Sequence, residues 1–195
     1  MKKLVTFIFL ICFSFVQAQS WTSTQLAKAN TAANIGYLTT VEKECIMYIN
    51  LCRLYPKEFL QNELLTYYGT DDYGDYLKDS EYRESLIDLL SNCAPLHALN
   101  FDDVLYRNAL CFAKEQGASG EIGHRRKYCE EGNYAECCSY GMSTAKDIAM
   151  QLLIDHNVPS LGHRENCLNS SYTKIGVSIQ AHSKWGTCAI FELIW

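Results

Sequence analysis

The sequence predicts an α+β fold, and three observations support this prediction. Apolar residues recur at helical spacing in several segments between residues 40 and 155. Two strand patterns follow near the end of the sequence, separated by a short polar turn. The composition, 48% hydrophobic and 20% charged, is that of a folded globular protein. Helices that precede a strand pair indicate an antiparallel sheet covered by helices.

The first 18 residues are predicted to be a secretory signal peptide. Lys2 and Lys3 form a basic start, residues 4–16 are apolar, and Ala18 marks a cleavage site before Gln19. The apolar run is too short to favour a membrane-spanning helix, and no later segment approaches that length. We therefore expect an exported protein, extracellular or periplasmic, without a transmembrane segment.

The remaining residues are expected to form one domain with a short extension. Residues 19–39 are polar and are interpreted as an N-terminal arm, and residues 40–195 are long enough for a single domain with its own core. The formal net charge is −5 and becomes more negative without the two signal lysines. An acidic surface argues against nucleic acid or anionic lipid as the main partner.

The first helix of the domain is predicted at residues 40–54, because Thr39 and Glu42 have the spacing of a capping box. Pro56 ends this helix and starts a short second one that continues to Leu64.

Two further helices are expected at residues 80–90 and 101–116. For the second, Asn100 is the predicted N-cap and Gly117 the predicted end. His97 lies in the linker between them and is interpreted as a surface or packing histidine.

The next segment is expected to begin with a loop that ends in Ala135-Glu136. A helix follows at residues 144–155, with Thr144 as its N-cap. After Pro159, a short turn opens with Gly162-His163-Arg164. A hairpin of strands at residues 175–179 and 188–193 closes the domain.

Nine cysteines remain once Cys12 leaves with the signal peptide. An exported protein is expected to pair most of them in disulfides, and an odd number leaves at least one free or bonded to another chain. Cys45 and Cys52 lie on one predicted helix, about 10 Å apart along its axis, which is too far for a bridge. The adjacent Cys137 and Cys138 are expected to have separate partners. A zinc–thiolate cluster is the alternative, although paired C-x-x-C spacings are absent.

Two motifs carry a resemblance to a known family. AECCSYG at residues 135–141 and SLGHRENCLN at residues 160–169 resemble the usual GENIAYG and SPGHRANILN of the bacterial branch of the CAP superfamily, also called SCP-like. That superfamily includes cysteine-rich secretory proteins and plant pathogenesis-related proteins. The resemblance covers residues 42–195; the second motif is the specific one, whereas Cys137-Cys138 replaces Asn-Ile in the first. It implies a three-layer α-β-α sandwich with a small antiparallel sheet.

The resemblance also implies a cleft that collects histidines and acids from separate loops. By position, His124 and His163 match the two histidines of the family and Glu136 matches the glutamate of the first motif. Asp155 falls in the position of a second acid, with His156 beside it. Two imidazoles with an open position suit zinc or a similar divalent ion, so His124 and His163 are the predicted ligands.

Other interpretations of these groups stay open at this point. The same side chains could serve as a general acid and base without a metal, or Glu136 and His163 could simply hydrogen-bond each other and tie two loops together. A Cys167–His163 dyad is disfavoured, because an oxidising compartment consumes most thiols. Residues 69–74 lack the ligand spacing of a calcium loop.

Two function hypotheses follow. The favoured one is a secreted binding or effector module, without turnover, whose cleft holds a metal or a small ligand; sterol or lipid binding is proposed for several family members. Its partner would be a small ligand, a lipid or an extracellular protein. The alternative is a metal-dependent hydrolase with Glu136 as the base. A ligand role for Glu136 favours the first hypothesis, and a free Glu136 facing a metal-bound water favours the second.

Overall fold

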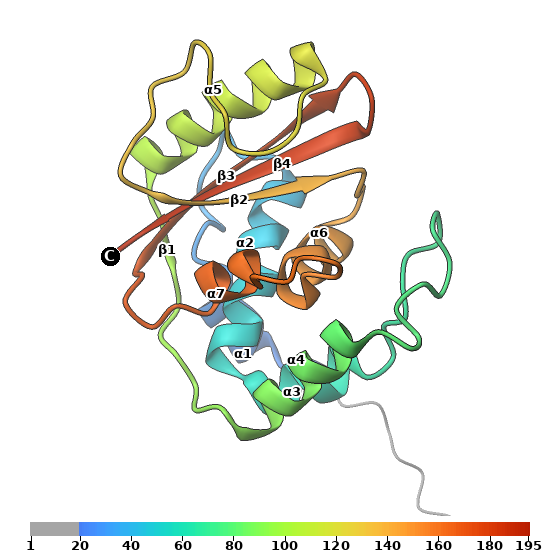
Figure 1. Ribbon diagram of the computed structural model, residues 1–195. Coiled ribbons are helices and arrows are strands. Elements are labelled where there is room, and N and C mark those ends of the chain that lie inside the picture. Colours follow the sequence, from blue (N-terminus) through green and yellow to red (C-terminus); the bar gives the residue numbers. More distant parts are fainter. Residues whose placement is uncertain (1–19) are drawn as a thin grey trace, which may run out of the picture.

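The computed structural model describes residues 20–195, so the predicted signal peptide lies outside the described part of the chain. Figure 1 shows helices on both sides of a small sheet, which confirms the α+β prediction. In chain order the elements are α1 (Ser23–Ala29), α2 (Thr40–Leu54), α3 (Pro56–Phe59), the π-helix η1 (Leu60–Leu64), α4 (Glu81–Asn92), β1 (Asn100–Phe101), α5 (Asp103–Ser119), β2 (Ala135–Tyr140), α6 (Ala145–Ile154), α7 (Gly162–Cys167), β3 (Lys174–His182) and β4 (Gly186–Ile194).

The sheet has the strand order β1-β3-β4-β2. β3 and β4 form the expected antiparallel hairpin, and β2 runs antiparallel to β4 at one edge. The sheet is mixed rather than purely antiparallel, because β1 pairs in parallel with β3. Asn100 is therefore not the cap of α5: its N–H donates to Thr173 O at 2.8 Å, and Asp102 caps the helix instead.

The elements form three layers. α5 covers one face of the sheet, and α2, α6 and α7 lie on the other (Figure 1). α5 packs so closely on β3 that a Cβ at Gly117 would lie 2.1 Å from Ala181 O. This close approach explains why Gly117 lies inside α5 and does not end it; the helix ends at Gly120, whose φ of +69° suits glycine.

Two predicted caps are confirmed. Thr39 and Glu42 form the capping box of α2, and the Thr144 hydroxyl accepts from the N–H of Asp147 in α6. Glu42 is almost fully buried, and its second carboxylate oxygen accepts from the N–H of Ile179 at 2.9 Å. The first helix of the domain is thereby fixed directly to β3.

A buried arginine, Arg164 of α7, ties together helices on the α6 side of the sheet. Arg164 donates to the carbonyls of Leu153 and Ile154 at 2.7 Å each, and thus satisfies the end of α6. It also donates to Tyr82 O in α4 at 2.7 Å. The arginine of the GHR motif therefore has a structural role beside its neighbour His163.

The cysteine prediction is largely wrong. Within residues 20–195 one disulfide forms, between Cys111 of α5 and Cys129 of the following loop. Seven cysteines are free, and six of these are buried, where cysteine packs as a small apolar residue. As expected, Cys45 and Cys52 of α2 are not bridged to each other. The expectation that Cys137 and Cys138 have separate disulfide partners is wrong, because both are free and buried. Among the same residues, no helix is long and apolar enough to cross a membrane.

Candidate functional site

The site lies at the β2 edge of the sheet, next to α6 and α7 and to the loop that follows α5. Ala135 and Glu136 do not end a loop, as the sequence had indicated; they begin β2, where Glu136 is paired with Glu192 of β4. Side chains alternate along a strand, so Glu136 and Cys138 point to the same face. The thiol of Cys138 lies 3.7 Å from Glu136 Oε1.

His163 and Asp155 form the first of two histidine–carboxylate pairs. Asp155 follows the end of α6 in the left-handed region, with φ 56°, and is 1% exposed. Its Oδ1 lies 2.7 Å from His163 Nδ1, while Oδ2 accepts from the N–H groups of His163 and Arg164 at 2.9 and 3.3 Å. One carboxylate thus orients the imidazole and caps the start of α7.

His124 and Glu136 form the second pair. His124 Nδ1 lies 2.7 Å from Glu136 Oε1, and 59% of the histidine side chain is exposed. The hydrogen bond to the carboxylate raises the pKa of His124. The other oxygen, Oε2, accepts from Arg126.

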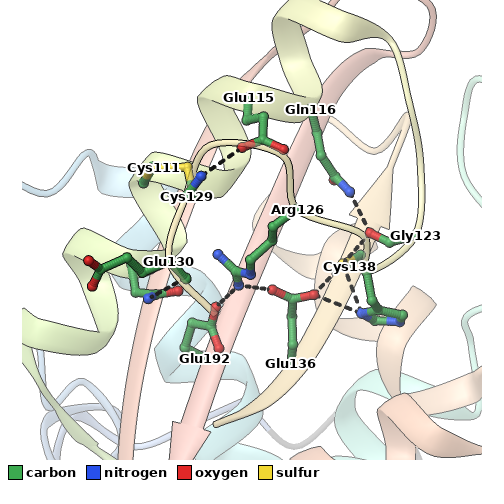
Figure 2. Close-up of polar contacts among 12 residues, drawn as sticks. Cys111, Glu115, Gln116, Gly123, Arg126, Cys129, Glu130, Glu136, Cys138 and Glu192 are labelled. Carbon is green, nitrogen blue, oxygen red and sulfur yellow. Dashed lines mark hydrogen bonds and ion pairs between the residues drawn. A yellow bond between two sulfur atoms is a disulfide. The ribbon is translucent and has the colours of Figure 1, made fainter. Parts of the chain in front are cut away.

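Arg126 connects this pair to a buried acid. Its Nη2 donates both to Glu136 and to Glu192 (Figure 2). Its guanidinium group lies 4.0 Å from the centre of the Phe112 ring. Glu192 is 1% exposed. Burial raises the pKa of Glu192 to about 8, and the nearby charge of Glu136 adds to the effect.

The loop that carries His124 is held at several points. Glu115 of α5 accepts from the N–H groups of residues 127–129 at 2.6–3.0 Å, next to the Cys111–Cys129 disulfide (Figure 2). At the other end of the loop, Gln116 donates to Gly123 O. These contacts position His124 although its side chain is largely exposed.

Both histidines and Asp155 line one cavity of about 300 Å³, together with His156 and Cys138, among others. The imidazole rings of His124 and His163 lie 6.3 Å apart between centroids. In each ring Nδ1 is bonded to a carboxylate, and no residue of the described chain hydrogen-bonds either Nε2. The two imidazoles therefore offer uncommitted nitrogens to the same space.

Glu136 does not line that cavity. It faces a second one of about 240 Å³ on the other side of His124, together with Arg126 and Glu192. The direct Glu136–His163 hydrogen bond considered from the sequence does not form; each residue has a different partner.

A group of potential metal ligands includes a residue that sequence reasoning missed. Ligand atoms of His124, Glu136 and Cys138 all lie within 4.8 Å of one another. Burial raises the pKa of the Cys138 thiol well above its ordinary value, so this thiol is not an activated nucleophile. Arg126 and Glu192 were also missed. The sequence does contain a signal for Glu192, because it is a charged residue within an otherwise apolar strand.

Residues 80–193 match the sequence model of the family described as CAP, the cysteine-rich secretory protein family. The matched segment is more than half of the 195 residues and contains both histidine–carboxylate pairs. A search of curated proteins found no match. The resemblance drawn from the two motifs is confirmed at the level of the family.

Proposed function

This chain belongs to the cysteine-rich secretory protein (CAP) family, and we propose that it is a secreted binding module whose cleft holds a divalent metal ion, with zinc as the favoured ion. Membership of the family supports a domain of the binding or effector type. His124 and His163 would hold the ion.

One observation carries this proposal: two imidazoles line one cavity, and each is oriented by a carboxylate at Nδ1, which leaves Nε2 free. Histidine ligands of metals commonly donate their other N–H to a carboxylate, which fixes the tautomer and the ring orientation. Neutral imidazole nitrogens are suitable ligands for zinc. When bound, the ion supplies a positive centre that attracts oxygen or nitrogen donors of a ligand.

The positions of the two acids argue against the hydrolase alternative. A general base needs a carboxylate oxygen within reach of the water that it deprotonates. Both oxygens of Glu136 are engaged, one by His124 and one by Arg126, and this side chain faces the other cavity. Asp155 is buried and bonded at both oxygens. Binding without turnover is therefore the function that this arrangement favours.

The surroundings of the cavity indicate what kind of ligand would fit. A neighbouring pocket of about 430 Å³ is lined by Tyr73, Tyr76, Met142 and Met150, and it shares Gln151 and His156 with the cleft. A ligand with a metal-binding donor at one end and an apolar part at the other matches this combination, so a small molecule, a lipid or an extracellular protein segment remains the proposed partner.

Zinc titration calorimetry tests the metal proposal on Cys138→Ser, which lacks the thiol beside His124, and on His124→Ala and His163→Ala in that background. We expect each substitution to weaken zinc binding by more than about 100-fold, beyond the 10–100-fold typical for loss of an outer-shell partner. Binding should also weaken in acid, where protons compete for the imidazoles.

His97→Ala is the matched control, because His97 lies outside the cleft and its Nε2 is 2.7 Å from Tyr172 O. In the same background, its zinc affinity should equal that of Cys138→Ser. A Cys138→Ser protein that binds no zinc, or a His163→Ala variant with unchanged affinity, would refute the assignment of the two histidines.

A further inference from the structure

We propose that His124, Glu136 and Cys138 form a second metal site, distinct from the two-histidine cleft, which takes a divalent ion that prefers thiolate ligands. The ligand atoms would be His124 Nδ1, Glu136 Oε1 and Cys138 Sγ. This site goes beyond the proposed function, since it lies on the Nδ1 side of His124 and does not involve His163.

The distances among the three atoms match a zinc coordination shell at two of three edges. In a tetrahedral shell with ordinary bond lengths, sulfur lies about 3.6 Å from a nitrogen or an oxygen ligand, and nitrogen lies about 3.4 Å from oxygen. Here Cys138 Sγ is 3.7 Å from His124 Nδ1 and 3.7 Å from Glu136 Oε1. The third edge, between His124 Nδ1 and Glu136 Oε1, is 2.7 Å because these atoms share a proton, and it must open slightly.

The backbone fixes two of the three ligands. Glu136 and Cys138 are alternate residues of β2, so their side chains share one face of a strand that is paired along its length with β4. Arg126 holds Glu136 by Oε2 (Figure 2), and this leaves Oε1 directed toward His124. Cys138 is buried but lines the 300 Å³ cavity, which gives an ion a route to the thiol.

The charges around the three ligands are compatible with a cation. A thiolate and a carboxylate together balance a divalent ion. Arg126 directs its hydrogen bonds at Glu136 and the buried Glu192 rather than at the ion. A soft sulfur ligand favours zinc and similar ions over magnesium or calcium.

Binding requires two protons to leave their positions. The thiol proton of Cys138 goes to solvent as the sulfur–metal bond forms, and the Nδ1 proton of His124 is lost from that nitrogen while Nε2 becomes the protonated one. Because His124 then no longer offers Nε2, the two sites exclude each other. The protein would hold one ion in either the cleft or the thiolate site.

Cobalt(II) is a probe that separates the two sites. A cobalt–thiolate bond gives an intense near-ultraviolet charge-transfer band, whereas cobalt held by imidazoles alone does not. We expect this band in the wild type and in His163→Ala, and its loss in Cys138→Ser. The matched control is Cys137→Ser, since Cys137 is the adjacent buried cysteine that packs in the core on the opposite side of β2; this variant should keep the band.

A second measurement guards against a folding defect in Cys138→Ser. In the wild type, cadmium should protect Cys138 from alkylation under native conditions, as read by peptide mass mapping, and leave the half-exposed Cys93 reactive. The proposal is overturned if cobalt binds His163→Ala, which lacks the two-histidine site, without a thiolate band, or if the band survives in Cys138→Ser. These outcomes leave the two-histidine site intact, because zinc titration of His163→Ala in the Cys138→Ser background tests that site separately.

Discussion

The two histidine–carboxylate pairs contain the same chemical groups but are held in different ways. His163 lies in the first turn of α7 and Asp155 at the end of α6. Asp155 is 1% exposed and has three hydrogen bonds to its oxygens. His124 lies on a loop with 59% of its side chain exposed, and its partner Glu136 is fixed by an ion pair with Arg126.

Because of this difference, the fold depends more on one pair, and the other pair can change its arrangement more easily. The carboxylate of Asp155 caps a helix as well as orienting His163, so the fold depends on it. If the carboxylate of Glu136 is removed, Arg126 still has Glu192 as a partner, so the fold can tolerate the loss of Glu136. We therefore expect the helix-held pair to be a rigid anchor and the loop-held pair to be the half that adapts to an ion.

The largest effect is expected for Asp155→Ala. This substitution removes three hydrogen bonds to a buried carboxylate and places alanine in the left-handed region. Hydrogen bonds to charged groups contribute about 1.5–3 kcal/mol each and are not additive, so we expect a loss of roughly 4 kcal/mol. Urea denaturation of the metal-free protein measures it.

Two variants sharpen this prediction. Asn157→Ala places alanine at a nearby exposed position with φ 62°, and should cost only about 1 kcal/mol for the backbone conformation. Glu136→Ala should also cost about 1 kcal/mol, because Arg126 keeps Glu192 as a partner. Equal losses in Asp155→Ala and Glu136→Ala would show that the two pairs do not differ as described.

The next effect concerns the disulfide that holds the loop half. Cys111 and Cys129 are 18 residues apart, and a link of about this length stabilises by about 3 kcal/mol in the chain-entropy account. Replacing both cysteines by serine should lower the free energy of unfolding by about that amount and also weaken zinc binding, because the loop carries His124.

Cys93→Ser is the control for the disulfide variant, since Cys93 is a free and half-exposed cysteine. Its stability and zinc affinity should match the wild type. If the disulfide variant lost stability but kept its zinc affinity, the Glu115 contacts with residues 127–129 alone would be sufficient to position the loop.

The sequence was most informative where a local pattern determines the structure. The capping box at Thr39 and Glu42 places the start of α2 correctly, and Thr144 does the same for α6. The start of α5 was misplaced because Asn100 and Asp102 are both good caps, and pairing with β3, which is distant in the sequence, decides between them.

For the site, the family motifs indicated the four residues that the fold brings together, but not their pairing. Glu136 forms an ion pair with Arg126, which lies ten residues earlier in a loop. Glu136 and Glu192 are brought together by the pairing of β2 with β4. Cys138 joins the site because Ala135 and Glu136 form a strand instead of a loop, and no spacing in the sequence distinguishes these states. Long-range strand pairing is the information that a single sequence lacks.

The smallest of the three main effects in this comparison is a change in pH dependence from Glu192. Burial raises its pKa to about 8 from 4.5, so between these values the folded protein keeps a proton that the unfolded chain has lost. Its contribution to stability is thus complete below pH 4.5 and is lost as the pH rises toward 8.

Glu192→Gln mimics the protonated acid and removes this dependence. From pH 6 to pH 7 the wild type should lose up to about 1.4 kcal/mol more than the variant, the limit for one proton. Urea denaturation at both pH values measures this difference, with Glu131→Gln, an exposed acid of the same small cavity, as the control. Parallel pH profiles for wild type and Glu192→Gln would mean that Glu192 is ionised in the folded state, and that the loop half holds two charged acids around Arg126 instead of one.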